Sequence, residues 1–169
     1  MVLGIGGMRL LEILQISPIV YHMNEGHSAF LSFEMAHHEM QRHKKSFLEE
    51  LDQTKQRIVF TNHTLVAAGN DTFSKDAVSA LLKKYAEEIQ VPVEDLVSLG
   101  VIPESSMFSL TTLALRMASK TNAVSRLHAK KALDIWPTNQ MIAITNGIHI
   151  PTWDAIINDV DIARIHDLQ

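Results

Sequence analysis

Three short apolar runs, each followed by a polar cluster, constrain the fold of this chain more than any other feature. The runs cover residues 19–23, 57–60 and 141–144, and their β-branched and aromatic residues are typical of short buried strands. Stretches with helical spacing separate the runs. Strands that alternate with helices are joined by crossovers, and a crossover makes successive strands parallel. The sequence therefore predicts an α/β fold with parallel strands and intervening helices.

The segments between these runs carry helix signals. Ser46 and Glu49 form a capping box at the start of one helix, and Ser74 is the predicted N-cap of another. The helix after Ser74 presents its apolar face at Val78, Leu81, Leu82, Tyr85 and Ile89. We also expect helices over 30–40 and 92–100, a turn over 4–7 before a short helix over 9–15, and a helical region over 109–136 with a break near 122.

Composition excludes several classes of protein. The 169 residues are enough for one domain with a hydrophobic core, and we expect no internal linker. A net charge of −4 argues against a nucleic-acid partner. The absence of cysteine excludes disulfides and thiol chemistry and suits a reducing cytoplasm. No apolar stretch approaches the roughly 18 residues that would cross a bilayer, so we expect no membrane association.

The polar clusters at 24–27, 61–64 and 145–147 are the candidate site. Ligands bind outside the carboxyl ends of parallel strands in open α/β sheets. If the three strands are parallel, their clusters meet at one rim, and the side chains there are Glu25, His27, Asn62, His63 and Asn146. Carboxylate, imidazole and amide groups both donate and accept hydrogen bonds, which suits a hydroxyl-rich ligand. The alternative is that each cluster satisfies local backbone groups at the start of a loop.

Other motifs are weaker. Gly4-Ile5-Gly6-Gly7 lacks the third glycine of a dinucleotide fingerprint, because Arg9 stands there. His38-Glu39 begins like a zinc motif, but Arg42 occupies the second histidine position, and His43 is rotated by about 140° on a helix. We interpret His37, His38 and His43 as a solvated helix face. Trp136 and Trp153 either stack on sugar rings or pack at helix ends. Neither Ser28 nor Ser125 has an evident orienting acid, so a serine-hydrolase triad has little support.

An ordered series of motifs resembles the α-glucan phosphorylases, the family of glycogen, starch and maltodextrin phosphorylases, and most closely their bacterial and archaeal branch. The motifs are Gly4-Ile5-Gly6-Gly7-Met8-Arg9, His22-Met23-Asn24-Glu25-Gly26-His27, Val59-Phe60-Thr61-Asn62-His63-Thr64, Ala68-Gly69-Asn70-Asp71, Leu113-Ala114-Leu115-Arg116, Asn122-Ala123-Val124-Ser125-Arg126-Leu127-His128 and Thr145-Asn146-Gly147-Ile148-His149-Ile150-Pro151-Thr152-Trp153.

This resemblance implies two Rossmann-like domains facing a cleft, with residues 1–169 as one partial α/β domain from the later part of the first. It implies a hexosyltransferase that cleaves terminal α-1,4-linked glucose from glucan or maltodextrin with phosphate, giving glucose 1-phosphate. Pyridoxal phosphate is the implied cofactor, and its phosphate group exchanges a proton with the substrate phosphate. The lysine that carries it, the phosphate-binding residues and the glycine-rich loop match no motif in this chain.

The resemblance also implies residue roles. His63 matches the catalytic histidine, whose imidazole meets the glucose 6-hydroxyl and whose carbonyl faces the developing oxocarbenium centre. Asn146 matches the asparagine that binds the same hydroxyl, and Val124 matches a residue that packs near it. His27 and Glu25 match positions near the acceptor sugar, although many relatives carry aspartate where Glu25 stands. Two departures are Ala123, where many relatives have glycine, and the loop over 64–67, where relatives of this branch commonly have prolines.

These expectations leave three readings. The chain is a segment of a phosphorylase that is inactive alone, a non-catalytic carbohydrate-binding or interaction fragment derived from that domain, or an independent nucleotide-binding domain. The incomplete glycine fingerprint argues against the third. Both ends of the sequence resemble cut edges, so we expect an open sheet edge and self-association through exposed core surface.

Overall fold

A four-stranded parallel sheet organises the computed structural model, which describes residues 1–103 and 105–150. The strands are β1 (Tyr21–Asn24), β2 (Ile58–Asn62), β5 (Lys120–Ala123) and β6 (Ile142–Ala143), in the order β1-β2-β5-β6. A separate antiparallel pair joins β3 (Thr72–Ser74) to β4 (Met107–Ser109). The predicted α/β class and the parallel arrangement of the three anticipated strands are thus confirmed.

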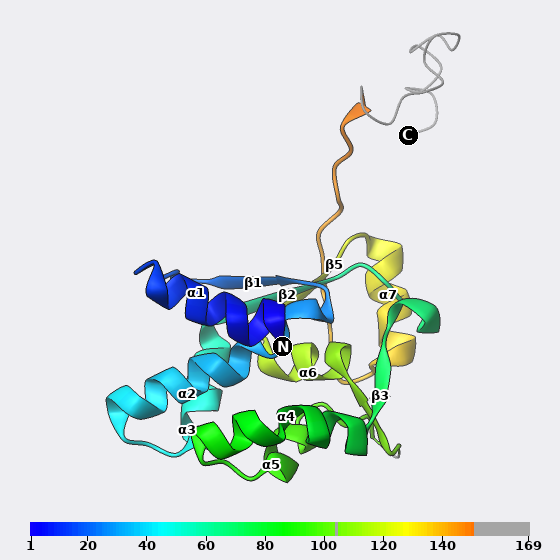
Figure 1. Cartoon of the computed structure of the whole chain (residues 1–169). Helices are drawn as coiled ribbons and strands as arrows, with labels where there is room; N and C mark the ends of the chain where they lie inside the picture. Colours follow the sequence, from blue (N-terminus) through cyan, green and yellow to red (C-terminus); the bar gives the residue numbers. More distant parts are fainter. Residues whose placement is uncertain (104, 151–169) are drawn as a thin grey trace, which may run out of the picture.

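Helices occupy the connections between strands. The α-helices are α1 (Gly7–Ile13), α2 (Leu31–His43), α3 (Phe47–Thr54), α4 (Lys75–Ile89), α5 (Val93–Ser98), α6 (Leu110–Met117) and α7 (Arg126–Ile135). Figure 1 shows α2, α3 and α6 on one side of the sheet formed by β1, β2 and β5. Each crossover advances in the same direction along the sheet, and right-handed crossovers in one direction place their helices on one face. Within the described residues, none of the helices has the length and apolarity needed to cross a bilayer.

The core lies between this sheet face and the helices. Met23, Ile58 and Phe60 point from β1 and β2 towards the helices and are fully buried. The same core contains an aromatic group in which the Phe30 ring lies 5.6 Å from that of Phe33 on α2 and 6.0 Å from that of Phe108 on β4. Alternate residues of β1 therefore face the core, which fixes the direction of the residues that follow the strand.

Predicted caps appear where the sequence placed them. Ser46 accepts from the backbone of Glu49, and Glu49 accepts from the backbone of Ser46, so the capping box of α3 is present. Ser74 accepts from the backbone N–H of Ala77 and caps α4. The apolar face of α4 is as predicted, except that Leu81 is exposed.

The predicted helical region over 109–136 is confirmed as the two helices α6 and α7, and the predicted break near 122 is a strand that the sequence analysis did not anticipate. Residues 120–123 form β5, which pairs with β2 on one side and β6 on the other. Its sequence, Lys-Thr-Asn-Ala, has no apolar run or alternation, so the strand is set by pairing between two neighbours rather than by its own propensity.

The predicted turn over 4–7 is also wrong. A π-helical turn, η1 (Val2–Gly6), runs directly into α1. Gly4 is needed for contact rather than for a turn, because a Cβ there would lie 2.8 Å from the backbone nitrogen of Leu31.

Candidate functional site

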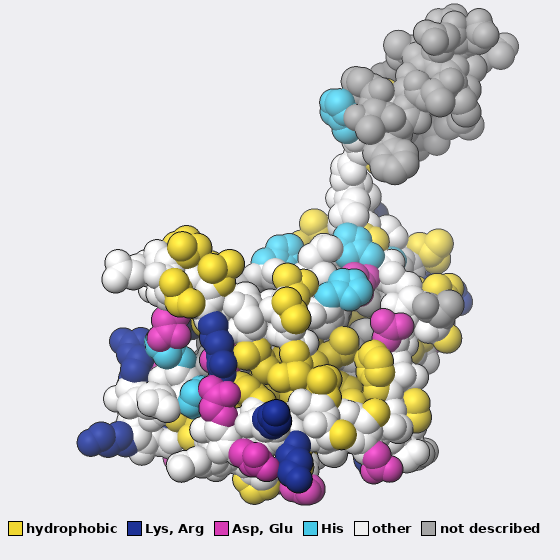
Figure 2. All heavy atoms as spheres, in the orientation of Figure 1, with side chains coloured by type: hydrophobic (Ala, Val, Ile, Leu, Met, Phe, Trp, Pro, Cys, Tyr) yellow, Lys and Arg dark blue, Asp and Glu magenta, His cyan; other side chains and the backbone are white. Residues whose placement is uncertain are grey.

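The carboxyl ends of β1 and β2 bring Glu25 and His63 together. The backbone N–H of His63 donates to Glu25 Oε1 at 2.5 Å, and the imidazole Nε2 of His63 lies 2.8 Å from Asn24 Oδ1. In the space-filling view of Figure 2, histidine and acidic side chains gather at this end of the sheet. We call this group, with Asn62 and His128, the strand-end rim.

Asn62 is the buried centre of the strand-end rim. Its side chain has no exposed surface, and its Nδ2 donates to the carbonyl of Thr64 at 3.2 Å and lies 3.5 Å from Glu25 Oε2. Its Oδ1 lies 2.8 Å from His128 Nε2. Because Nδ2 serves two acceptors, Oδ1 must accept, so His128 carries its proton on Nε2. Burial lowers the pKa of His128, which favours this neutral form.

His128 reaches the strand-end rim from α7. Ser125 caps this helix by accepting from the His128 backbone at 3.1 Å, so Ser125 acts as a cap and not as a nucleophile paired with the histidine. Sequence reasoning did not select His128 as a site residue. Its position three residues after a capping serine was a signal for the first turn of a helix, but the contact with Asn62 depends on the tertiary fold.

Asn146 and Val124 meet through the backbone. The N–H of Asn146 donates to the Val124 carbonyl at 3.1 Å, which places the residues after β6 beside those after β5. Val124 is half-buried and Asn146 is exposed. The segment after β6 therefore approaches the strand ends, and Asn146 presents its side chain to solvent.

His27 lies apart from this network. It belongs to the 3-10 turn η2 (Gly26–Ser28) directly after Glu25, and its side chain is exposed. Within the described part of the chain, no hydrogen bond or ion pair joins His27 to Glu25 or His63. Of the five residues to which the resemblance assigns roles, four therefore lie in the segments that follow β1, β2, β5 and β6, and His27 lies on the turn after Glu25.

The departures from the expected pattern have local explanations. Ala123 is buried in β5 and is not among the residues with positive φ, so it needs no glycine-like conformation. The loop after His63, which lacks the expected prolines, is held instead by Asn70. The Nδ2 of Asn70 donates to the carbonyls of Thr64 at 3.2 Å and Val66 at 3.0 Å, and its Oδ1 accepts from Thr111 at 2.9 Å.

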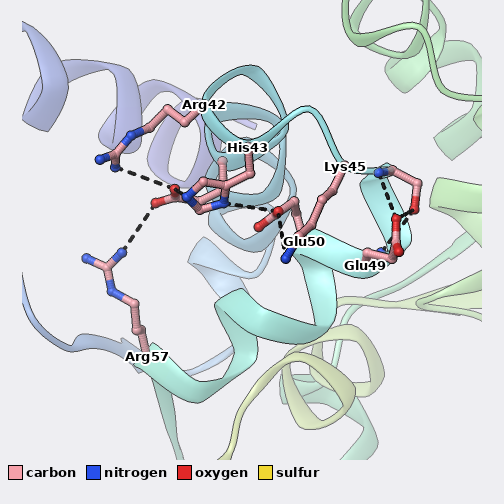
Figure 3. A network of polar contacts seen from close by, with 8 residues as sticks. Arg42, His43, Lys45, Glu49, Glu50 and Arg57 are labelled. Atoms are coloured by element: carbon pink, nitrogen blue, oxygen red, sulfur yellow. Dashed lines mark hydrogen bonds and ion pairs between the residues drawn. The ribbon is translucent and has the colours of Figure 1, made fainter.

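Two histidines of α2, His38 and His43, contact carboxylates away from the strand-end rim. His38 lies 2.9 Å from Glu12, and His43 lies 3.1 Å from the buried Glu50 and 3.7 Å from Glu39. Arg42, His43 and Arg57 all contact Glu39. Because His43 also contacts Glu50, these contacts join α2 to α3 and to the segment before β2 (Figure 3). In the described residues, no set of three or more side chains is grouped to hold a metal ion.

Of the two tryptophans, Trp136 lies among the described residues. Trp136 follows α7, is half-buried and packs against the hydrophobic core, which favours the packing interpretation. Trp153, with Pro151 and Thr152 of the same motif, lies outside the described residues.

Pyridoxal phosphate does not fit the strand-end rim on these residues alone. None of the side chains that bond to one another there is a lysine, so the rim has no amine that could form a Schiff base with the cofactor. The Glu25 carboxylate in the rim would repel a phosphate group. What the rim offers is hydroxyl recognition, with an imidazole, amides and a carboxylate held in fixed positions.

The fold and this rim define a parallel α/β domain whose strand ends gather carboxylate, imidazole and amide side chains. Comparison with known proteins finds relatives that are named as phosphorylases. Over 160 residues, or 89% of this chain, the sequence is 40% identical to a maltodextrin phosphorylase of Thermococcus litoralis. Over 90% of this chain it is 31% identical to a glycogen phosphorylase of Mycobacterium tuberculosis, and over 90% it is 28% identical to one of Aquifex aeolicus.

The resemblance to the α-glucan phosphorylases is therefore confirmed over about 90% of the chain. The chain spans 19% to 23% of the length of these curated relatives. No family model matches it. The similarity thus concerns one segment, whose strand ends carry the motifs.

Proposed function

We propose that this chain is a segment of an α-1,4-glucan phosphorylase, from the later part of the first of two domains, and that its strand-end rim binds the terminal glucose unit. The observation that carries the proposal is the convergence of the motif residues: Glu25, Asn62 and His63 contact one another at the end of a parallel sheet. This is the location at which α/β sheets bind ligands. The similarity to maltodextrin and glycogen phosphorylases selects a glucan from among hydroxyl-rich ligands.

His63 is the proposed catalytic residue. With Nε2 at 2.8 Å from Asn24 Oδ1, a proton on Nε2 leaves Nδ1 as an acceptor for a sugar hydroxyl. Its carbonyl belongs to a peptide unit whose flanking groups are both held, His63 N–H by Glu25 and Thr64 C=O by Asn62. A dipole fixed before charge develops stabilises an oxocarbenium-like transition state more than one that must reorient.

The other proposed contacts follow the strand ends. Asn146 supplies an amide to the same hydroxyl, Val124 packs beside it, and His27 faces the acceptor side. The exposed side chains of Asn146 and His27 are accessible to a ligand. In the complete enzyme the glucosyl unit is transferred to phosphate, giving glucose 1-phosphate. Pyridoxal phosphate, bound by residues outside this chain, supplies the proton-exchanging phosphate for that step. A place in cytoplasmic carbohydrate metabolism belongs to the same proposal and agrees with the cysteine-free sequence.

Titration of the 15N-labelled chain with maltotriose tests the binding proposal. We expect shift changes at His63, Val124 and Asn146, and loss of those changes in His63→Ala. The matched control is His37→Ala, which removes an imidazole from α2. Unchanged spectra at the strand-end rim, or changes confined to other surfaces, would refute the proposal.

A parallel assay tests the expected inactivity. The chain alone, incubated with maltodextrin, phosphate and pyridoxal phosphate, should release no glucose 1-phosphate above a buffer control. Release above the control would show that residues of this chain hold the cofactor, contrary to the fit described above.

Self-association is a further part of the proposal. β1 is an edge strand of the sheet, and Figure 2 shows hydrophobic side chains gathered over α1 beside it. Ile13 of α1 is 77% exposed and Ile19, just before β1, is 86% exposed. Exposed apolar side chains beside an open strand edge promote association. Light scattering should show dimers or larger species, reduced by Ile13→Lys with Ile19→Lys. A monodisperse monomer at high concentration would contradict this.

A further inference from the structure

Glu25 has an unusual backbone conformation for its residue type. It has φ 62° and ψ 176°, a region that is essentially restricted to glycine. Glycine would adopt this conformation without steric cost. A strained backbone of this kind persists only where the surrounding structure holds it, which here indicates an interaction of the side chain that a glycine could not make.

The turn at Glu25 also interrupts the hydrogen-bond ladder between β1 and β2. Asn24 is paired with Thr61, and Glu25 N–H donates to the Thr61 carbonyl at 3.0 Å, as a parallel ladder requires. The next bond of such a ladder would run from His63 N–H to the carbonyl of Glu25. Instead, His63 N–H donates to Glu25 Oε1 at 2.5 Å. The side-chain carboxylate therefore takes the place of the residue's own carbonyl.

This substitution places a charged acceptor on the backbone of His63. Hydrogen bonds to an ionised acceptor are about twice as strong as neutral ones. The second carboxylate oxygen faces Asn62 Nδ2 at 3.5 Å, and Asn62 in turn holds the carbonyl of Thr64. The ionisable groups near the carboxylate are His63 at the end of β2 and His128 on α7. The Oε1 atom of Glu25 is thus occupied by the backbone N–H of His63.

We propose that Glu25 is a positioning residue that fixes the main chain of His63 by replacing a ladder carbonyl with its carboxylate. The expected effect of Glu25 on sugar binding rests on the proposed function of His63. The hydrogen bond between Glu25 and the His63 backbone can be tested without any sugar.

Amide NMR of the labelled chain tests the contact. The His63 amide proton should resonate downfield, move upfield in Glu25→Gln, and lose protection from hydrogen exchange by about tenfold in Glu25→Gly, the loss expected when a hydrogen bond to a charged group is removed. Glu94→Gln, which neutralises an exposed carboxylate in the first turn of α5, is the matched control and should leave this resonance unchanged.

Glu25→Gly separates positioning from general support of the fold. Because glycine relieves the strained backbone, this variant should unfold at a denaturant concentration no lower than that of the parent chain. Unchanged shift and protection of the His63 amide in Glu25→Gly would overturn the proposal. So would a global loss of protection that extends to core strand amides such as that of Phe60.

Maltotriose binding provides a second test of the proposal. Glu25→Gly should weaken binding by about tenfold, since the loss of one charged hydrogen bond frees the His63 peptide. Glu25→Asp, which keeps the charge on a shorter stem, should restore part of it. Equal affinity in the parent chain and Glu25→Gly would overturn the positioning role. Failure of the parent chain to bind would refute the proposed function, and the amide measurements would still decide the contact.

Discussion

Replacing Asn62 by alanine removes the buried centre of the strand-end rim. The side chain has no exposed surface and joins three segments: the turn after β1 through Glu25, the loop after β2 through Thr64, and α7 through His128. Asn62→Ala leaves the Nε2 proton of His128 without its acceptor. The Thr64 carbonyl keeps a second donor in Asn70. We therefore expect the largest consequence at His128.

The magnitude follows from these contacts. Loss of the bond to Thr64 costs about 0.5–1.5 kcal/mol, and a stranded donor at His128 costs about 1–3 kcal/mol. His128 is only half-buried, so its cost lies at the low end of that range, about 1 kcal/mol. The sum is about 1.5–2.5 kcal/mol, which lowers the ratio of folded to unfolded protein by about 10- to 70-fold.

Urea unfolding followed by circular dichroism measures this loss. Gln53→Ala, which removes an exposed amide from α3, is the control and should lie within about 0.5 kcal/mol of the parent chain. Asn62→Asp keeps the shape but replaces the donor with a carboxylate facing Glu25, so it should also be destabilised. If Asn62→Ala and Asn62→Asp both match the parent chain, the strand-end rim is not the cooperative network described here.

Three further predictions concern stability. Burial lowers the pKa of His128 below its ordinary value of about 6.5, so the folded state binds fewer protons than the unfolded state. The free energy of unfolding should therefore be constant above about pH 6.5 and fall as the pH decreases below it. Urea unfolding should show a smaller fall of this free energy in His128→Gln. Gly100→Ala places a methyl group against the buried ring of Phe108 and should cost about 1–3 kcal/mol in thermal unfolding, with partial rescue by Phe108→Leu. Ser125→Ala removes the cap of α7 and should cost about 1 kcal/mol by the same measurement; no effect would contradict the cap.

Features that depend on neighbouring residues in the sequence were predictable. The capping box of Ser46 and Glu49 and the cap at Ser74 are confirmed, because each is formed within one turn of backbone. The apolar runs that became β1 and β2 were also found, since buried strands need β-branched and aromatic residues. The rule that ligands bind at strand ends then placed Glu25 and His63 at one edge before their contact was known.

Features that depend on pairing across the fold were not predictable. β5 has a polar sequence with no strand signal, and only its position between β2 and β6 makes it extended. The same holds for His128, whose contact with Asn62 joins residues 66 positions apart.

The sequence by itself determined the parallel α/β class, the helix caps and the motifs that resemble the phosphorylases, because these depend on residue type and short spacing. The tertiary structure decided how those motif residues are used. Glu25 sits at the end of β1 as predicted, yet the backbone turn at that residue directs its carboxylate to the His63 main chain. That outcome depends on the register of β1 and β2, which local residue preferences do not specify.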